Sequence, residues 1–232
     1  MPMSEFFEGS VYFGVLISLA TYGVGVLLKR RFKLGLLNPL LIAIVLTIFI
    51  LVVFRIDYET YNEGAKYISY LLTAATICLA VPLYEQFELL KKHSRAVIAG
   101  ICSGVITSLC SVLALAIIFH LDYASYVTFL PKSITTAIGM SVSEELGGNV
   151  AVTVVVIVMT GVLGNIFAEG ICKLFKIEDP VAKGIAIGTA SHAIGTSKAM
   201  EMGKVEGAVS SLSIVVAGIL TVIGANIFAK FM

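Results

Sequence analysis

The stretch DPVAKGIAIGTASHAIGTSK, residues 179–198, decides how the rest of the chain is interpreted. Asp179 can cap the free amide groups of a helix and Pro180 suits the first turn, so the pattern predicts a helix that begins here. Small or polar residues then recur at every fourth position: Gly184, Gly188, His192 and Thr196. On a continuous helix these residues lie along one face, which is therefore nearly bare of bulky side chains.

Another helix can approach that face closely because its glycines carry no side chain. His192 lies within an apolar stretch, where an imidazole needs either a hydrogen-bond partner or a chemical task. Two interpretations follow. His192 takes part in a polar site for a solute or a proton, or it bonds a facing helix while the glycines only permit close packing.

The composition is that of an integral membrane protein. Of 232 residues, 58% are hydrophobic and only 13% are charged, with a mean hydropathy of +0.99. A soluble domain has about 25% charged residues. The net charge of +1 gives no sign of nucleic-acid binding, so no nucleic-acid partner is expected. None of the four cysteines belongs to a C-x-x-C pair, which argues against a disulfide framework or a zinc site.

Apolar runs of about 20 residues predict membrane-spanning helices. Besides the 179–198 segment, such runs cover residues 11–28, 36–54, 65–84, 96–119, 150–175 and 207–231. Residues 131–148 are shorter and more polar, and they either cross the membrane, giving eight segments, or re-enter it, giving seven. We therefore predict an all-α polytopic membrane protein with seven to eight transmembrane segments and interrupted or re-entrant helices.

Basic residues predict which ends of the spans face the cytoplasm. Lys29, Arg30 and Arg31 follow the first span directly, which places the N-terminus outside. Lys91 and Arg95 precede the fourth span and place that loop in the cytoplasm. This is the side that the loop must reach if each of the first three spans crosses the membrane once. The first half of the chain is therefore consistent in charge and in the number of crossings.

Two parts of the chain resemble each other. Matching residues recur about 141 positions apart: Gly23 and Gly164, Pro39 and Pro180, and the triplet Glu-Gly-Ala at 63–65 and at 206–208. We predict a single membrane domain, 1–232, with repeat A at about 11–84, linker helices at 96–148 and repeat B at about 152–227. Chance similarity between apolar helices is the alternative.

The orientation of these repeats depends on residues 131–148. Inverted repeats, which are common in secondary transporters, require this stretch to cross the membrane. The charges favour parallel repeats, because Lys173, Lys176 and Lys183 reach the cytoplasm only if the stretch re-enters. We expect inversion on the precedent of transporters.

The first candidate site is PKSITT, residues 131–136. Pro131 can open a helix, and the hydroxyls of Ser133, Thr135 and Thr136 follow it closely. A helix N-terminus carries unpaired amides and a partial positive charge, which suit a carboxylate or a phosphate. The alternative is an interfacial helix whose hydroxyls bond its own backbone.

The second candidate site lies in the 179–198 segment. Ser191, His192 and Thr196 can bind a small polar solute, while Gly188 and Gly195 allow packing and sliding. Pro39, Pro131 and Pro180 are expected to start helices at packing or hinge positions. The sequence contains no Walker loop, no H-E-x-x-H and no G-x-S-x-G elbow, so no enzyme, metal or cofactor is expected.

Several of these motifs resemble the LrgB/CidB family. The resemblance is carried by Asn38-Pro39, Pro82-Leu83-Tyr84, Pro131-Lys132-Ser133 with Thr135-Thr136, Gly147-Gly148, Asp179-Pro180, Glu206-Gly207-Ala208 and above all by GTASHAIGT at 188–196. It covers essentially the whole chain. Ala137 departs from the pattern, since many relatives are expected to have proline after the paired threonines.

The resemblance implies a prokaryotic inner-membrane protein of the antiholin-like type, linked to murein hydrolase export and autolysis. It also implies a small LrgA/CidA-type membrane partner. Plant plastid relatives exchange glycolate for glycerate, and some bacterial relatives are tied to pyruvate uptake.

Two functions follow from the motifs and the resemblance together. The leading hypothesis is a transporter of small monocarboxylates, with Ser133, Thr135 and Thr136 at the carboxylate and Ser191, His192 and Thr196 at its other polar atoms. The alternative is a modulator of membrane permeability, which acts through its oligomeric state and its partner and has no solute site. In either case we expect a multi-pass homo-oligomer in the lipid bilayer.

Overall fold

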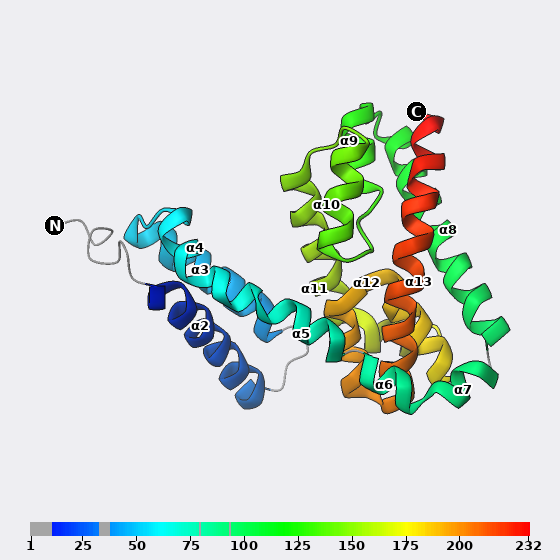
Figure 1. Ribbon diagram of the computed structural model, residues 1–232, viewed down its shortest axis with the longest axis horizontal. Coiled ribbons are helices and arrows are strands. Elements are labelled where there is room, and N and C mark those ends of the chain that lie inside the picture. Colours follow the sequence, from blue (N-terminus) through cyan, green and yellow to red (C-terminus); the bar gives the residue numbers. More distant parts are fainter. Residues whose placement is uncertain (1–10, 33–37, 79, 93) are drawn as a thin grey trace. The chain divides into compact units, whose positions relative to one another are not determined.

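The computed structural model describes residues 11–32, 38–78, 80–92 and 94–232, without the side chains of Val11, Leu72, Thr73, Thr76, Pro82, Leu83, Leu89 and Leu90. All regular structure in these ranges is helical, which confirms the predicted all-α class (Figure 1). The chain divides into two compact units, residues 1–78 and 79–232. The N-terminal residues and the predicted start of the second span at Leu36 lie outside the described ranges.

The described residues of the first unit, 11–32 and 38–78, form α2 (Val11–Phe32), α3 (Pro39–Phe54), α4 (Tyr58–Ser69) and α5 (Leu71–Cys78). Pro39 is the first residue of α3, and the Asn38 side chain caps this helix by accepting from the Leu40 amide at 2.8 Å. Hydroxyl pairs join α2 to its neighbours: Ser18 with Tyr61, and Thr21 with Thr47. These bonds satisfy polar groups inside a largely apolar bundle.

The second unit contains the remaining elements: α6 (Ala80–Glu85), α7 (Phe87–Lys92), α8 (Ser94–Ile118), α9 (Tyr123–Phe129), α10 (Thr136–Glu145), α11 (Val150–Leu174), α12 (Pro180–Met202), α13 (Lys204–Phe228) and the short 3-10 helix η1 (Ala229–Phe231). The helices α8, α11 and α13 are each 25 residues long and apolar. At 1.5 Å per residue each is about 37 Å long, enough to cross the hydrocarbon core of a bilayer.

Helices α9 and α10 form a hairpin, residues 123–145, which we call hairpin 1. Thr153, in the first turn of α11, bonds both arms: its hydroxyl donates to the Thr128 carbonyl at 3.0 Å and to the Ser143 hydroxyl at 2.7 Å. The end of α9 and the end of α10 therefore both lie beside the start of α11, and Figure 1 shows hairpin 1 at the same end of the unit as the C-terminus of the chain. The stretch 131–148, which we expected to cross, turns back instead.

Helix α12 is also a hairpin, which we call hairpin 2. The backbone of His192 leaves helical geometry, with φ 41° and ψ −142°, and the chain reverses there. Gly184 before the break and Met200 after it both lie against the start of α13, at Val209 and Gly207. The prediction that Gly184, Gly188, His192 and Thr196 share one face of a continuous helix is therefore wrong, because they belong to two antiparallel arms.

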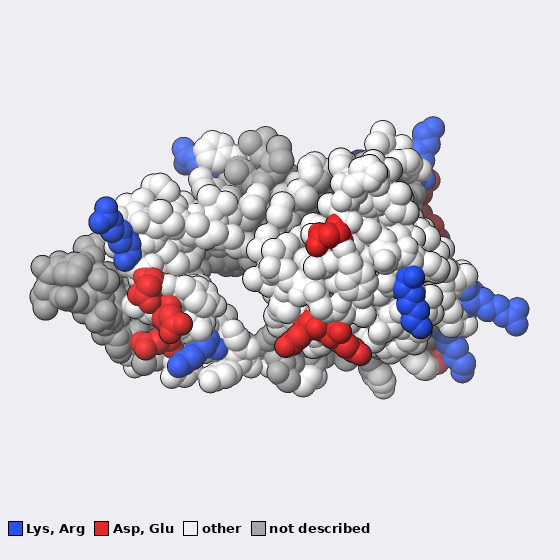
Figure 2. All heavy atoms as spheres, turned by 90° about the horizontal axis from the view of Figure 1, so that it is seen from above, with Lys and Arg blue, Asp and Glu red and all other residues white. Residues whose placement is uncertain are grey.

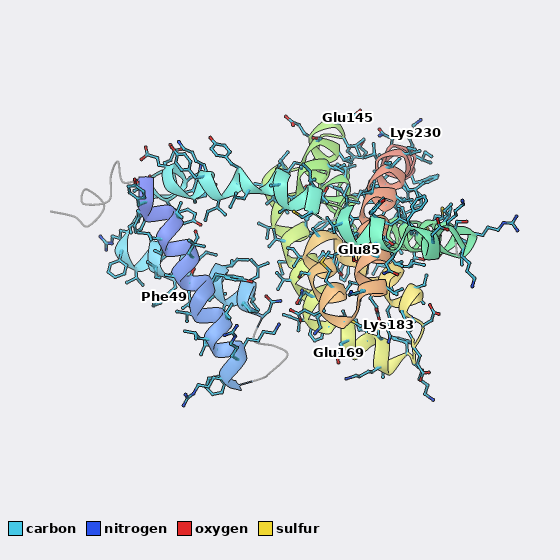
Figure 3. The ribbon with its side chains drawn as sticks, turned by 60° about the horizontal axis from the view of Figure 1, so that its bottom comes forward. Phe49, Glu85, Glu145, Glu169, Lys183 and Lys230 are labelled. Atoms are coloured by element: carbon cyan, nitrogen blue, oxygen red, sulfur yellow. The ribbon has the colours of Figure 1, made fainter. Side chains whose placement is uncertain are left out.

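The surface and the charges fit a membrane protein. Four helical stretches are long and apolar enough to cross a membrane: Tyr12–Phe32, Ser94–Ile118, Val150–Leu174 and Lys204–Phe231. The face shown in Figure 2 is mostly uncharged. In the second unit, Glu145 and Lys230 lie at one end, and Glu169 and Lys183 lie at the other (Figure 3). The described residues thus belong to a membrane protein with several apolar helices.

Two parts of the predicted architecture stay predictions. The segment expected as the third span, 65–84, is divided among α4, α5 and α6. The repeat at a spacing of 141 pairs α3, a single helix of 16 residues, with α12, which reverses. Neither the count of seven to eight spans nor that repeat is settled by the helices seen here.

Candidate functional site

The tips of the two hairpins meet at one turn of α11. Gly139 of hairpin 1 lies against the end of the Ile157 side chain, which would have to move to admit a larger residue at this position. The Ile157 carbonyl in turn lies 2.9 Å from Nε2 of His192, at the tip of hairpin 2. Because the hairpins start from opposite ends of the unit, their tips meet inside it.

The tip of hairpin 1, the middle of α8 and the first arm of hairpin 2 border a cavity of about 390 Å³, which is open on the side where Ser103, Thr107, Ser111, Ala186 and Ala190 are exposed. Its lining is almost wholly small or polar: Ser103, Gly104, Thr107, Ser108, Ser111, Lys132, Ser133, Ala186, Thr189 and Ala190. Ser108 lies ten residues from the end of α8 at Ile118, about 15 Å along the helix axis. The cavity is therefore at mid-depth between the two ends of the unit, where hydroxyls are unusual.

Lys132 places a cation in this cavity. Its Nζ donates to the Ser133 hydroxyl at 2.9 Å and to the Ser108 hydroxyl at 3.2 Å. None of the lining residues is acidic, and among the described residues no carboxylate forms an ion pair with Lys132. A cation among neutral hydroxyls in a membrane-embedded cavity favours a small anion as its partner.

The predicted residues of the first site are divided by the structure. Ser133 is buried and lines the cavity. Thr135 is the N-cap residue of α10 but makes no side-chain cap hydrogen bond, and Thr136 is the first residue of that helix. Both threonines are half-buried, and neither is among the lining residues. Pro131 is buried in the turn that precedes them, so the prediction that it starts a helix is wrong: α10 begins five residues later, at Thr136.

The predicted residues of the second site are packed into the protein. Ser191, His192 and Thr196 are all buried. The Thr196 hydroxyl donates to the His192 carbonyl at 2.9 Å and pairs with the Ser210 hydroxyl of α13 at 2.7 Å. These groups join the tip of hairpin 2 to α11 and α13, and they do not line the Lys132 cavity.

Glycines allow this packing. The Ser191 side chain occupies the space where Gly164 of α11 lacks one, and the His192 ring lies where a Cβ of Gly161 would come within 2.7 Å of it. Gly188 packs against Ser210, and Gly195 packs against Ser191. Pro180 begins α12 and Asp179 caps it through the Ala182 amide at 2.9 Å, so the predicted start of this helix is confirmed.

Sequence reasoning missed Lys132, Ser108 and Thr189 as members of one cavity. Lys132 stood within the quoted motif, and a cation between hydroxyls in an otherwise apolar region was the available signal. Ser108 and Thr189 give no local signal, because their roles depend on which helices pack together.

A second cavity, of about 520 Å³, lies at the end of the unit where α11 ends and α12 begins. Its charged lining residues are balanced, with four lysines and four glutamates: Lys173, Lys176, Lys183, Lys198, Glu169, Glu178, Glu201 and Glu206. Lys198 pairs with Glu169 at 3.4 Å and with Glu201 at 3.3 Å. This terminal cavity is neutral in total and carboxylates line it, whereas the lining of the Lys132 cavity contains none, so the Lys132 cavity is the better candidate for an anion.

The fold and the site together define a class: a helical membrane protein in which two opposed hairpins meet at a polar, cationic cavity. The chain belongs to the LrgB-like family, whose sequence model matches residues 18–231. It is 39% identical over 222 residues to the antiholin-like protein LrgB of Bacillus cereus strain B4264, covering 95% of this chain and 96% of that protein. The antiholin-like protein LrgB of Bacillus anthracis strain A0248 matches equally well.

These comparisons confirm the family resemblance found in the motifs. They also support membrane residence, and the relatives' names describe no enzyme activity. No solved structure matches the chain.

Proposed function

We propose that this LrgB-like protein is a secondary transporter of small monocarboxylates and that Lys132 binds the carboxylate. The single observation that carries this proposal is the Lys132 ammonium, which lies at mid-depth in a hydroxyl-lined cavity without an acidic partner among the described residues. An anion that enters the cavity balances this charge and replaces the water lost on burial.

The lining suggests how such a substrate is held. The carboxylate accepts hydrogen bonds from Lys132 Nζ and the Ser133 hydroxyl, while Ser108 and Thr189 face the hydroxyl or keto oxygen of a two- or three-carbon acid. Glycolate, glycerate and pyruvate have this chemistry. Of the predicted substrate-binding residues, Ser133 keeps direct contact, and Ser191, His192 and Thr196 support the site by fixing hairpin 2.

The same proposal gives the orientation in the bacterial inner membrane. Arg95 precedes α8, and Lys173, Lys176 and Lys183 gather where α11 ends and α12 begins. With hairpin 1 turning back, the positive-inside rule puts all of them on the cytoplasmic side and the N-terminus outside. Hairpin 2 then enters from the cytoplasm and hairpin 1 from the outside.

Transport by proteoliposomes that contain the purified protein tests the proposal. Wild-type protein should take up radiolabelled glycolate, glycerate or pyruvate, and Lys132→Met should lower the apparent affinity about 100-fold, since a charge-assisted bond is worth roughly 1.5–3 kcal/mol. Lys230→Met is the matched control, because Lys230 is exposed at the end of the chain. Absence of uptake by wild type, or unchanged uptake by Lys132→Met, would refute it.

The name of the relatives, antiholin-like protein, supports a second candidate: a modulator of membrane permeability. In that role we expect it to act with an LrgA/CidA-type partner and as a homo-oligomer. The burial of His192 and Thr196 in helix contacts also suits that role. Dye leakage separates the two functions. A modulator releases a neutral dye from the vesicles whether or not Lys132 is present, whereas a carrier retains the dye and depends on Lys132.

A further inference from the structure

The two hairpins are related by a second, more regular sequence repeat within residues 79–232. Residues 94–147 can be aligned with residues 150–203 at a constant offset of 56 positions, and short segments then agree in three places. The matching segments are FHLD at 119–122 with FKIE at 175–178, AIGMS at 137–141 with AIGTS at 193–197, and Gly147 with Gly203. The same offset therefore holds before, within and after each hairpin.

The helix boundaries and backbone angles show the same offset of 56 positions. Helices α8 and α11 have 25 residues each and begin at Ser94 and Val150. Each is followed by a non-glycine residue with a left-handed backbone, His120 with φ 52° and Lys176 with φ 54°. A left-handed residue is a common helix ending, and Arg55 after α3 has one too, but here it falls at equivalent positions of the two repeats, in agreement with the offset. Because hairpins 1 and 2 enter from opposite ends, the two repeats are inverted.

The equivalent interfaces of the two repeats differ in packing. Between hairpin 1 and α11, Thr128 is bonded through its carbonyl to Thr153 and through its hydroxyl to the Asn149 amide at 2.8 Å. Val127, Thr128 and Leu130 are buried there. This interface is closed.

The equivalent interface, between α8 and the first arm of hairpin 2, is closely packed where Gly100 meets Ile185 and Gly104 meets Thr189, but unlike its counterpart it has a large cavity beside these contacts. This cavity, of about 800 Å³, reaches from Ala96 and Asp179 inward. Four residues line both this cavity and the Lys132 cavity: Ser103, Gly104, Ala186 and Thr189. The two cavities therefore adjoin, and together they extend from the end of the unit at Asp179 to Lys132 along only one of the two related interfaces.

We infer that residues 79–232 adopt a second conformation, the counterpart of this one, in which the interface of hairpin 1 with α11 opens and that of hairpin 2 with α8 closes. Repeats of similar sequence can exchange conformations at similar free energy, and a solute then reaches the same site from the other side. The inference rests on the proposed function, because the site reached alternately is the Lys132 cavity.

Pairs of residues that occupy equivalent positions in the two repeats are suitable sites for cysteine labelling. Ala186 is exposed on the open path, and the position 56 residues earlier is Leu130, which is only 1% exposed. Gly104, which contacts Thr189, corresponds to the half-buried Thr160 of α11. In the second conformation Leu130 and Thr160 line the newly opened path, and Ala186 is covered.

Single cysteines are introduced at Ala186, Leu130 and Thr160 in a background whose four native cysteines are replaced by alanine. Right-side-out and inside-out vesicles are then treated with a membrane-impermeant maleimide. Ala186→Cys should be labelled from the side of Asp179 only, and Leu130→Cys and Thr160→Cys from the opposite side only. Ile219→Cys, on an exposed apolar face of α13, is the control that stays unlabelled from both sides.

A crosslink tests whether the two openings exclude each other. The hydroxyls of Ser143 and Thr153 are 2.7 Å apart, so Ser143→Cys with Thr153→Cys is suited to a disulfide that holds hairpin 1 against α11. The disulfide should reduce labelling at Thr160→Cys about tenfold or more and preserve labelling at Ala186→Cys, because it traps the present conformation. Labelling after solubilisation in SDS verifies that each cysteine is present and reactive.

The inference fails if Leu130→Cys and Thr160→Cys both stay unlabelled from either side, if they react from the same side as Ala186→Cys, or if the crosslink leaves Thr160→Cys labelling unchanged. Labelling requires no substrate, so its result is independent of the proposed function. Labelling of Ala186→Cys is then repeated with glycolate present. If the cysteines react from the expected sides but glycolate does not slow labelling of Ala186→Cys, the second conformation stands and only the monocarboxylate site is refuted.

Discussion

Hairpins 1 and 2 have the same topology but use their polar tips differently. The tip of hairpin 1 is a turn of six residues between two short helices, and it presents Lys132 and Ser133 to a cavity. The tip of hairpin 2 is a break at one residue, and His192 there bonds the Ile157 carbonyl within the protein. The polar residues at one tip thus face open space, and those at the other are bonded within the fold.

The largest expected effect comes from filling the space into which hairpin 2 packs. Gly164→Ala introduces a methyl group that collides with Ser191, so hairpin 2 should be displaced and the free energy of unfolding should fall by about 3 kcal/mol. Unfolding by SDS in mixed micelles measures this change.

Gly170→Ala is the matched control in the same helix, because its added methyl meets nothing within 4 Å. That variant should be unchanged or up to about 1 kcal/mol more stable, since alanine favours helix. Equal losses in the two variants would mean that hairpin 2 does not need a close approach to α11.

The next effect concerns the backbone at the break. The φ of 41° at His192 favours glycine, so His192→Gly should be about 1–2 kcal/mol more stable than His192→Ala, although both lose the bond to Ile157. Unfolding by SDS in mixed micelles measures which of these two variants is the more stable.

Transport by these variants sharpens the comparison of the tips. If His192 acts only on the fold, His192→Gly keeps glycolate affinity within about threefold of wild type, in contrast to Lys132→Met. A loss as large as that of Lys132→Met would instead place His192 at the ligand.

A smaller effect is expected where hairpin 2 meets α13. Thr196 and Ser210 are fully buried and their hydroxyls are 2.7 Å apart. A double-mutant cycle with Thr196→Val and Ser210→Ala should give a coupling free energy of about 1 kcal/mol, with the double variant less damaged than the two single losses predict. Additive losses would show that the two hydroxyls act independently.

The smallest effect is expected at the end of hairpin 2. Lys198 pairs with Glu169 and Glu201, whose side chains are half-exposed at 48% and 52%. Lys198→Ala should therefore cost less than about 1 kcal/mol, and 0.5 M NaCl should reduce the difference from wild type further. A loss as large as that of Gly164→Ala would show that these ion pairs, rather than close packing, hold the hairpin.

The start of hairpin 2 could be predicted from the sequence, but its reversal could not. Asp179 and Pro180 are local signals, and the cap that they predict is present. The residues around His192 carry no comparable helix-breaking pattern, because the break depends on space left by Gly161 and Gly164 in another helix. Contacts between segments that are far apart in the sequence cannot be predicted from the local pattern of residues.

In the candidate site, too, local signals predicted some features correctly, whereas features that depend on tertiary packing could not be predicted. Ser133 was predicted from hydroxyls beside a proline, and it lines the cavity. Ser191, His192 and Thr196 were predicted from polarity alone, and that reasoning could not separate a ligand from a neighbouring helix as their partner. The offset of 56 residues was present in the sequence as two copies of A-I-G-x-S, and it is a better guide to the hairpins than the spacing of 141.

Ile157 of α11 has a consequence for leakage. Its side chain meets Gly139 of one hairpin and its carbonyl meets His192 of the other, so neither tip can withdraw without disturbing the residue that supports its counterpart. A pathway open to both sides of the membrane at once would let ions leak and would dissipate the ion gradients of the cell. A single shared residue between the two tips is a physical means of keeping one end sealed while the other is free.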